Sequence, residues 1–167
     1  MYHVITGNGK GKTTAALGMS LRAAGAGMHV FFAQFVKGKH YAEHNMLKLI
    51  PNVEFELMGR TCFIEKDPEQ ADFDAALAGW QNVLKKADDD DLQMIVLDEL
   101  HIALYYKLLS IEQVVQFIIQ NKNKLEIVST GRYAPTELLE IADLVSEVQE
   151  IKHYYNDGVE AREGIEY

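Results

Sequence analysis

Cysteine and proline are scarce in this chain, which has one cysteine and three prolines among 167 residues. A single cysteine, Cys62, excludes a disulfide framework within one chain and a cysteine-based zinc site. No apolar run approaches the roughly 20 residues that a membrane-spanning helix needs. The first residues carry no secretory signal pattern. We therefore expect a cytoplasmic protein that does not associate with membranes.

Basic residues are also few in comparison with acidic ones. The chain has 16 Lys and Arg residues against 25 Asp and Glu residues, and its formal net charge is −9. Without a stripe of basic residues, binding to nucleic acid is not expected. The hydrophobic content of 48% and charged content of 25% are ordinary for a globular protein. We predict that residues 1–167 form a single domain.

Apolar runs of strand character alternate along the chain with segments of helical periodicity. Such alternation predicts an α/β fold with a mostly parallel central sheet and helices on both faces. Ligands of such sheets bind at the carboxyl ends of the strands. The predicted strands are 2–5, 29–35, 53–58, 92–97, 125–129 and 144–151, and the predicted helices are 12–26, 41–49, 70–86, 111–119 and 136–142.

A glycine-rich turn with a Lys-Thr pair follows the first predicted strand. The standard phosphate-loop pattern is G-x-x-x-x-G-K-[ST], and here Thr6 fills the first glycine slot, so that Gly7 comes one residue late. Strand, turn and helix still stand in the order that binds phosphate with inward-facing N–H groups and a helix N-terminus. The predicted phosphate-binding residues are Gly7, Asn8, Gly9, Lys10, Gly11, Lys12, Thr13 and Thr14, with the Thr13 hydroxyl also a magnesium ligand.

The run from Met94 to Leu97 ends in two acids, Asp98 and Glu99. Phosphate-loop proteins hold magnesium or its water shell with acids at the end of a core strand. We place Glu99 first and Asp98 second as the metal contact. The alternative is an acidic strand end that simply faces water.

Basic residues offer further contacts for a polyphosphate. Lys37 and Arg132 each follow a predicted strand, and Arg22 lies in the first helix. Several cations are needed to offset a polyphosphate, so these three are candidate nucleotide contacts. Ordinary surface charge or an internal ion pair is the alternative. No nucleophile–base pair stands out, although His101 is close enough to the acids in sequence to line the site.

Together these residues resemble the ATP:corrinoid adenosyltransferases of the cobalamin-salvage type. The resemblance covers nearly the whole chain, and its combination of segments is more specific than any one of them. The matching segments are TGNGKGKTTAA (6–16), QFVKG (34–38), VLDEL (96–100), TGR (130–132), ADLVSE (142–147), Lys152-His153 and GIEY (164–167).

The resemblance implies a RecA-like phosphate-loop fold, often dimeric. In the implied reaction, the cobalt(I) of a reduced corrinoid attacks the 5′ carbon of ATP, and inorganic triphosphate leaves. Magnesium or Mn²⁺ would accompany ATP, and a flavoprotein would supply electrons. Carried over by position, the nucleotide-site residues are Asn8, Lys12, Thr13, Glu99 and Arg132, with Lys12 and Glu99 as the catalytic pair.

One segment departs from the family pattern. Family members carry a Phe-x-Trp pair in the loop after the third predicted strand, and here the stretch reads Cys62-Phe63-Ile64. Phe63 is therefore the candidate corrinoid contact. Two other readings stay open: a phosphate-loop ATPase or kinase-like phosphotransferase, and a catalytically weak relative that binds nucleotide or corrinoid.

Overall fold

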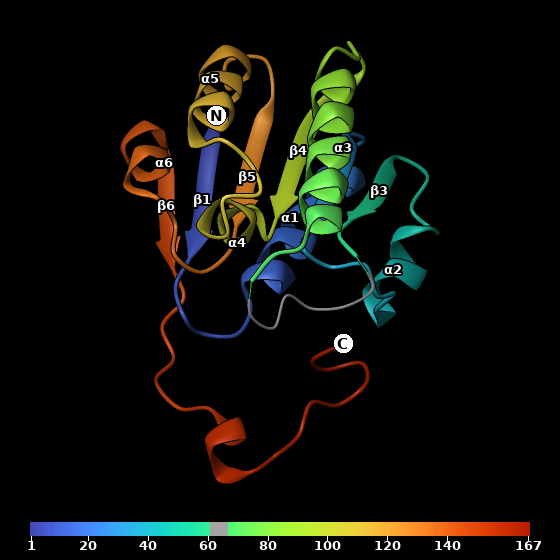
Figure 1. Ribbon diagram of the computed structural model, residues 1–167. Helices are drawn as coiled ribbons and strands as arrows, with labels where there is room; N and C mark the ends of the chain where they lie inside the picture. The colour runs from blue at the N-terminus through green and yellow to red at the C-terminus, as the bar shows by residue number, and fades with distance from the viewer. Residues whose placement is uncertain (61–66) are drawn as a thin grey trace.

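Six strands form one sheet in the computed structural model, which describes residues 1–60 and 67–167. The strand order is β3-β2-β4-β5-β1-β6, and all neighbouring strands pair in parallel (Figure 1). The predicted parallel α/β sheet is thereby confirmed. The strands are β1 (Tyr2–Thr6), β2 (His29–Phe35), β3 (Val53–Met58), β4 (Leu92–Asp98), β5 (Glu126–Thr130) and β6 (Leu144–Glu147).

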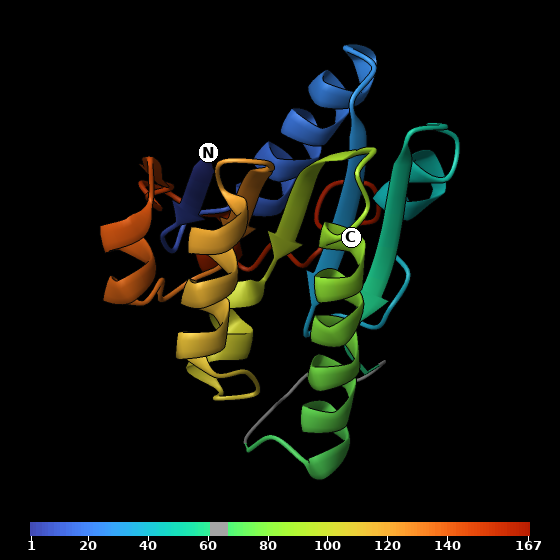
Figure 2. The ribbon, with the colours of Figure 1, turned by 90° about the horizontal axis from the view of Figure 1, so that it is seen from above.

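Helices cover both faces of the sheet. Figure 2 shows α1 and α2 on one side and α3, α4, α5 and α6 on the other. The central strands are buried on both faces, which is why they read as continuous apolar runs rather than as alternating ones. The helices are α1 (Lys12–Gly25), α2 (Ala42–Leu47), α3 (Gln70–Ala87), α4 (Leu100–Tyr105), α5 (Ile111–Asn121) and α6 (Thr136–Ile141).

The core has two halves, one on each face. Successive residues of β2 point to opposite faces, so Phe31 packs with α3 and α5 while Phe32 packs with α1. Trp80 of α3 is buried, as its place on the apolar side of the helix predicted, and it meets the Phe117 ring edge-on at 5.2 Å. The two cores pack against opposite faces of the sheet and so fix the positions of its strand ends.

Three segments differ from the sequence expectation. Strand β6 ends at Glu147 rather than at residue 151, because it lies at the sheet edge with exposed side chains and pairs only with β1. Helix α4 was not predicted, and it begins where Glu99 adopts a left-handed conformation, φ 57°. A short 3-10 helix, Tyr154–Asp157, interrupts the polar tail.

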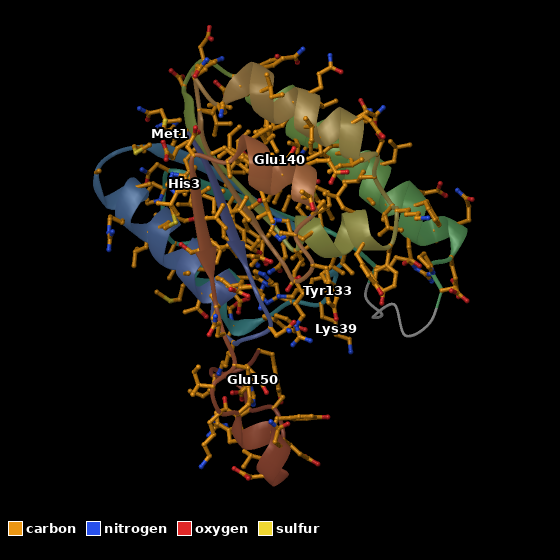
Figure 3. All side chains as sticks on the ribbon, turned by 90° about the vertical axis from the view of Figure 1, so that its left-hand side faces the viewer. Met1, His3, Lys39, Tyr133, Glu140 and Glu150 are labelled. Atoms are coloured by element: carbon orange, nitrogen blue, oxygen red, sulfur yellow. The ribbon has the colours of Figure 1, made fainter. Side chains whose placement is uncertain are left out.

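The carboxyl ends of the strands meet at one end of the molecule. Figure 3 shows Lys39 and Tyr133, which follow β2 and β5, at that end, with Met1 and His3 at the other. The chain beyond Glu150 leaves from the same end and passes beneath it (Figures 1 and 3). In the described residues, no helix is long and apolar enough to cross a membrane.

Candidate functional site

A cavity of about 930 Å³ lies at the carboxyl end of the sheet. This volume suits a ligand of nucleotide size or larger. Its walls come from the phosphate loop, from the turn after β2, from the start of α2, from α4, and from the tail. The site residues on its wall are Asn8, Gly9, Lys10, Gly11, Lys12, Thr13, Thr14, Lys37, Glu99 and Arg132.

The phosphate loop is packed against the segment that follows β6. Gly7 has φ +101°, and a Cβ placed there would lie 2.4 Å from the Val148 carbonyl oxygen. The Gly9 N–H donates to that same carbonyl at 2.8 Å. Only glycine permits this approach and this backbone conformation. Gly7 therefore shapes the loop from behind and is not itself on the cavity wall.

Lys12 is 8% exposed, although it carries a charge. Its ammonium group folds back and donates to the Gly9 carbonyl at 2.7 Å. Burial lowers the pKa of Lys12, and the nearby Glu99 carboxylate opposes that shift. A buried ammonium at the mouth of a helix N-terminus is well placed to attract an anion.

Asp98 is fully buried and joins three parts of the site. Its Oδ1 accepts a hydrogen bond from the Thr130 hydroxyl at 2.6 Å. Its Oδ2 accepts one from Gln34 at 2.8 Å and one from the Thr13 hydroxyl at 3.2 Å. The carboxylate thus ties the phosphate-binding helix to β2 and β5.

Glu99 follows Asp98 but reaches the cavity wall. Burial and the Asp98 charge raise the pKa of Glu99. The Lys37 ammonium lies 3.9 Å from Asp98 and 4.0 Å from Glu99. Lys37 therefore makes the internal ion pair considered above and also lines the cavity, so the two alternatives are compatible.

The oxygen donors here fit magnesium. In the described part of the chain, no three His, Cys, Asp or Glu residues form a complete metal cage. Magnesium, however, is usually held by one or two carboxylates together with substrate phosphates and water. The Thr13 hydroxyl donates a hydrogen bond to Asp98, which leaves the lone pairs of its oxygen free for a cation, and Glu99 supplies a carboxylate at the cavity.

The two remaining candidate cations, Arg132 and Arg22, lie in different parts of the structure. Arg132 lies on the cavity wall directly after β5. Arg22 lies exposed in the last turn of α1, whereas the phosphate loop adjoins the first turn, and it does not line the cavity. Phe63, with Cys62 and Ile64, falls outside the described residues, so its corrinoid contact stays a prediction.

A chain of buried polar groups behind Asp98 was not predicted. The Tyr41 backbone N–H donates to His44 Nδ1, so the neutral ring donates from Nε2 to the Gln34 side chain at 3.0 Å. Gln34 in turn donates to Asp98. Burial lowers the pKa of His44, which favours this neutral form. In the sequence, the feature that could have indicated this chain of polar groups was Gln34, a polar residue near the end of an otherwise apolar strand.

The tail also reaches the loop. The Lys10 ammonium donates to Glu166 at 2.7 Å and to the Tyr154 hydroxyl at 3.0 Å. The Tyr154 hydroxyl also donates to Glu166, and Arg162 lies 4.9 Å from the Tyr154 ring centre. We call these four residues the tail cluster. From the sequence, the tail was marked only by the matching segments Lys152-His153 and GIEY (164–167), with no indication that it meets Lys10.

Residues 1–167 match the model of one protein family, described as "ATP:corrinoid adenosyltransferase BtuR/CobO/CobP". The chain belongs to this family. A corrinoid adenosyltransferase of Escherichia coli K12 is 39% identical over 166 residues, which cover 98% of this chain and 84% of that protein. The corrinoid adenosyltransferase CobA of Salmonella typhimurium is 40% identical with the same coverage. The resemblance seen in the sequence is thus confirmed.

Solved structures support the fold of this adenosyltransferase family member. The flagellar accessory protein FlaH of Methanocaldococcus jannaschii superposes with a TM-score of 0.60 at 11% identity, covering 87% of this chain and 70% of FlaH. The cytoplasmic domain of EssC gives a TM-score of 0.58 at 13% identity, covering 96% of this chain and 33% of that one. At these identities the likeness concerns architecture, and it agrees with the predicted RecA-like fold.

Proposed function

We propose that this protein transfers the 5′-deoxyadenosyl group of ATP to the cobalt(I) of a corrinoid and releases inorganic triphosphate. The match of the whole chain to the adenosyltransferase family carries this proposal. The cavity supports it, because Lys10, Lys12, Lys37 and Arg132 gather cations at one end of a protein whose net charge is −9.

The reaction is a displacement at carbon. The cobalt(I) electron pair forms the cobalt–carbon bond as the bond between the 5′ carbon and oxygen breaks, and that electron pair leaves with the triphosphate. Cobalt(I) is itself a strong nucleophile, so the protein does not need a base. Its task is to orient ATP and to stabilise the charge that develops on the leaving group. We assign that stabilisation to Lys12, Arg132 and the N–H groups of the phosphate loop.

We assign the magnesium site to Thr13 and Glu99, with Asp98 as the group that orients Thr13. Asp98 already accepts three hydrogen bonds and is fully buried, which suits an anchor better than a direct ligand. Magnesium, when bound, neutralises part of the triphosphate charge, and Mn²⁺ has the same preference for oxygen ligands.

The finer assignments rest on the resemblance and stay predictions. They are a homodimer, a flavoprotein reductant and the Phe63 contact with the corrinoid. A cytoplasmic location and a nucleotide contact of Arg22, which does not line the cavity, are predictions from the residues alone.

A product assay tests the function. The protein is mixed with ATP, magnesium and chemically reduced cobalamin, and the absorption spectrum is followed while the phosphate products are separated. We expect adenosylcobalamin and intact triphosphate in equal amounts. Phosphate or ADP without a cobalt–carbon bond would instead identify an ATPase or phosphotransferase. Binding of both substrates without turnover would identify a carrier.

A further inference from the structure

A line of fully buried polar side chains runs behind the Arg132 turn. It joins Tyr2 of β1, Ser129 of β5 and His101 of α4, each 0% exposed. The Tyr2 hydroxyl and Ser129 Oγ are 2.7 Å apart, and His101 Nε2 lies 2.9 Å from the same Oγ. His101 Nδ1 lies 2.9 Å from the Gly131 carbonyl oxygen. None of these three side chains lines the cavity.

The direction of these hydrogen bonds follows from the groups involved. A carbonyl oxygen can only accept, so His101 Nδ1 carries the proton that Gly131 receives. With this proton on Nδ1, the neutral ring that burial favours has no proton on Nε2, which accepts from the Ser129 hydroxyl. Ser129 Oγ then accepts from Tyr2. Every polar atom in the line is paired, and the ring has one fixed tautomer.

The line ends on the turn that carries Arg132. Gly131 has φ +140°, and a Cβ there would lie 2.8 Å from His101 Cβ, so the turn is packed directly on the histidine. The residue before Gly131, Thr130, is held by Asp98. The residue after it, Arg132, is exposed on the cavity wall, and no hydrogen bond or ion pair joins it to another described residue. Its position therefore depends on how the backbone of the turn is held.

We infer that His101 is a positioning residue: its Nδ1–H bond to the Gly131 carbonyl holds the turn so that Arg132 meets the triphosphate of ATP. His101 touches no substrate and acts only through Arg132. This inference rests on the proposed function, since it names a device that aids departure of the triphosphate. Ser129 and Tyr2 pair the remaining buried polar atoms of the line.

A double-mutant cycle tests the inference. His101→Leu fills similar space but removes the donor, and we expect kcat to fall about 10- to 100-fold, because small displacements of a charge-stabilising group have effects of that size. The kcat of the Arg132→Ala variant should fall by at least the same factor. The double variant should be no slower than Arg132→Ala alone. Independent, multiplying losses in the double variant would overturn the inference.

Two matched variants separate positioning from packing. Tyr2→Phe removes a hydroxyl from the same line but leaves the His101–Gly131 bond, so we expect kcat within about twofold of the parent even if the melting temperature falls. His101→Asn keeps an N–H donor near the Nδ1 position and should recover most of the activity. Equal losses in Tyr2→Phe and His101→Leu, or no recovery in His101→Asn, would contradict the role of this bond.

Binding of inorganic triphosphate gives a readout that needs no turnover. By calorimetry with magnesium, we expect His101→Leu to weaken triphosphate binding several-fold in the parent background and not at all in the Arg132→Ala background. Weakening by the same factor in both backgrounds would overturn the inference. If the parent forms no adenosylcobalamin, the proposed function fails, yet this binding cycle still decides the role of His101.

Discussion

Two lysines of one loop, Lys10 and Lys12, meet very different surroundings. Lys12 is 8% exposed and donates to the carbonyl of Gly9, three residues away. The Lys10 side chain is 38% exposed, and its partners Tyr154 and Glu166 are more than 140 residues away in the sequence. Burial lowers the pKa of Lys12, whereas the hydrogen bond that Lys10 donates to Glu166 raises the pKa of Lys10.

Lys12 is thus held within the phosphate loop itself, whereas Lys10 is held by residues of the tail. A desolvated charge acts strongly on any anion that enters its surroundings, because water screens it little. A charge in an exposed ion pair is screened and contributes little. We therefore expect the buried side of the cavity, with Lys12 and Asp98, to dominate the reaction, and the tail cluster to adjust it.

Lys12→Ala should produce the largest effect on activity. Loss of one preorganised group that stabilises leaving-group charge costs up to about 1,000-fold in kcat. Lys10→Ala is the matched control, because it removes the same side chain from the other side of the loop, and it should cost less than about tenfold. Initial rates of adenosylcobalamin formation measure both. Equal losses of rate in the two variants would show that the buried and the exposed lysine contribute alike.

Asp98→Asn should lower both stability and activity. The new amide group would face donors from Gln34 and Thr13, leaving donors unpaired in a buried place at a cost of about 2 kcal/mol in the free energy of unfolding. Glu99→Gln is the comparison, since Glu99 borders the cavity and makes fewer internal contacts. It should keep its stability in urea unfolding but require more magnesium for half-maximal rate. Unchanged stability in Asp98→Asn would mean that this acid is no anchor.

His101 should make the metal-free protein sensitive to acid. Burial lowers its pKa from 6.5 to about 4, although the hydrogen bond to the Gly131 carbonyl and the Asp98 charge oppose the shift. Between these values the unfolded chain binds the proton and the folded chain does not. Stability is therefore full above pH 6.5 and falls by up to about 3 kcal/mol as the pH drops to 4.

Urea unfolding of the parent and of His101→Leu across this pH range measures the contribution of His101. The pKa of His44 is lowered as well and that of Glu99 is raised, but both groups remain in the variant. The difference between the two curves therefore isolates His101. A parent and a variant with parallel pH dependence would show that the ring is not held neutral.

Glu166→Gln should have the smallest effect. It keeps the shape of the tail cluster but removes the charge that Lys10 meets, so the KM for ATP should change by less than about threefold, and the change should shrink in high salt. Exchange of the two charges, Lys10→Glu with Glu166→Lys, tests the pair further. Recovery in this double variant of a loss seen in each single variant would show that the contact, and not either charge alone, matters.

The sequence predicted the parts of the site that are continuous in the chain. The phosphate loop, the acids after β4 and the cations after β2 and β5 follow local patterns, and the rule that parallel strands end together brings them to one edge. It also ranked Glu99 above Asp98 as the metal contact, and the geometry supports the same order, although that assignment stays a proposal.

The remainder depends on contacts between distant segments. Thr13, Gln34 and Thr130 bond Asp98 from three different elements, and no spacing within one segment reveals that they meet. The tail cluster joins residues 10 and 166 for the same reason. Strand β6 was predicted too long because an apolar alternation does not reveal that a strand lies at an exposed edge, where pairing can stop early.

The hydrogen bond between the Gly9 N–H and the Val148 carbonyl has a consequence for biosynthesis. The phosphate loop leaves the ribosome well before residue 148, which completes the backbone that supports it. Because synthesis proceeds at about 5–20 residues per second, the nascent chain spends several seconds with its loop sequence present but unsupported. Newly made protein should thus gain its affinity for nucleotide late and abruptly, which would keep incomplete chains from sequestering ATP.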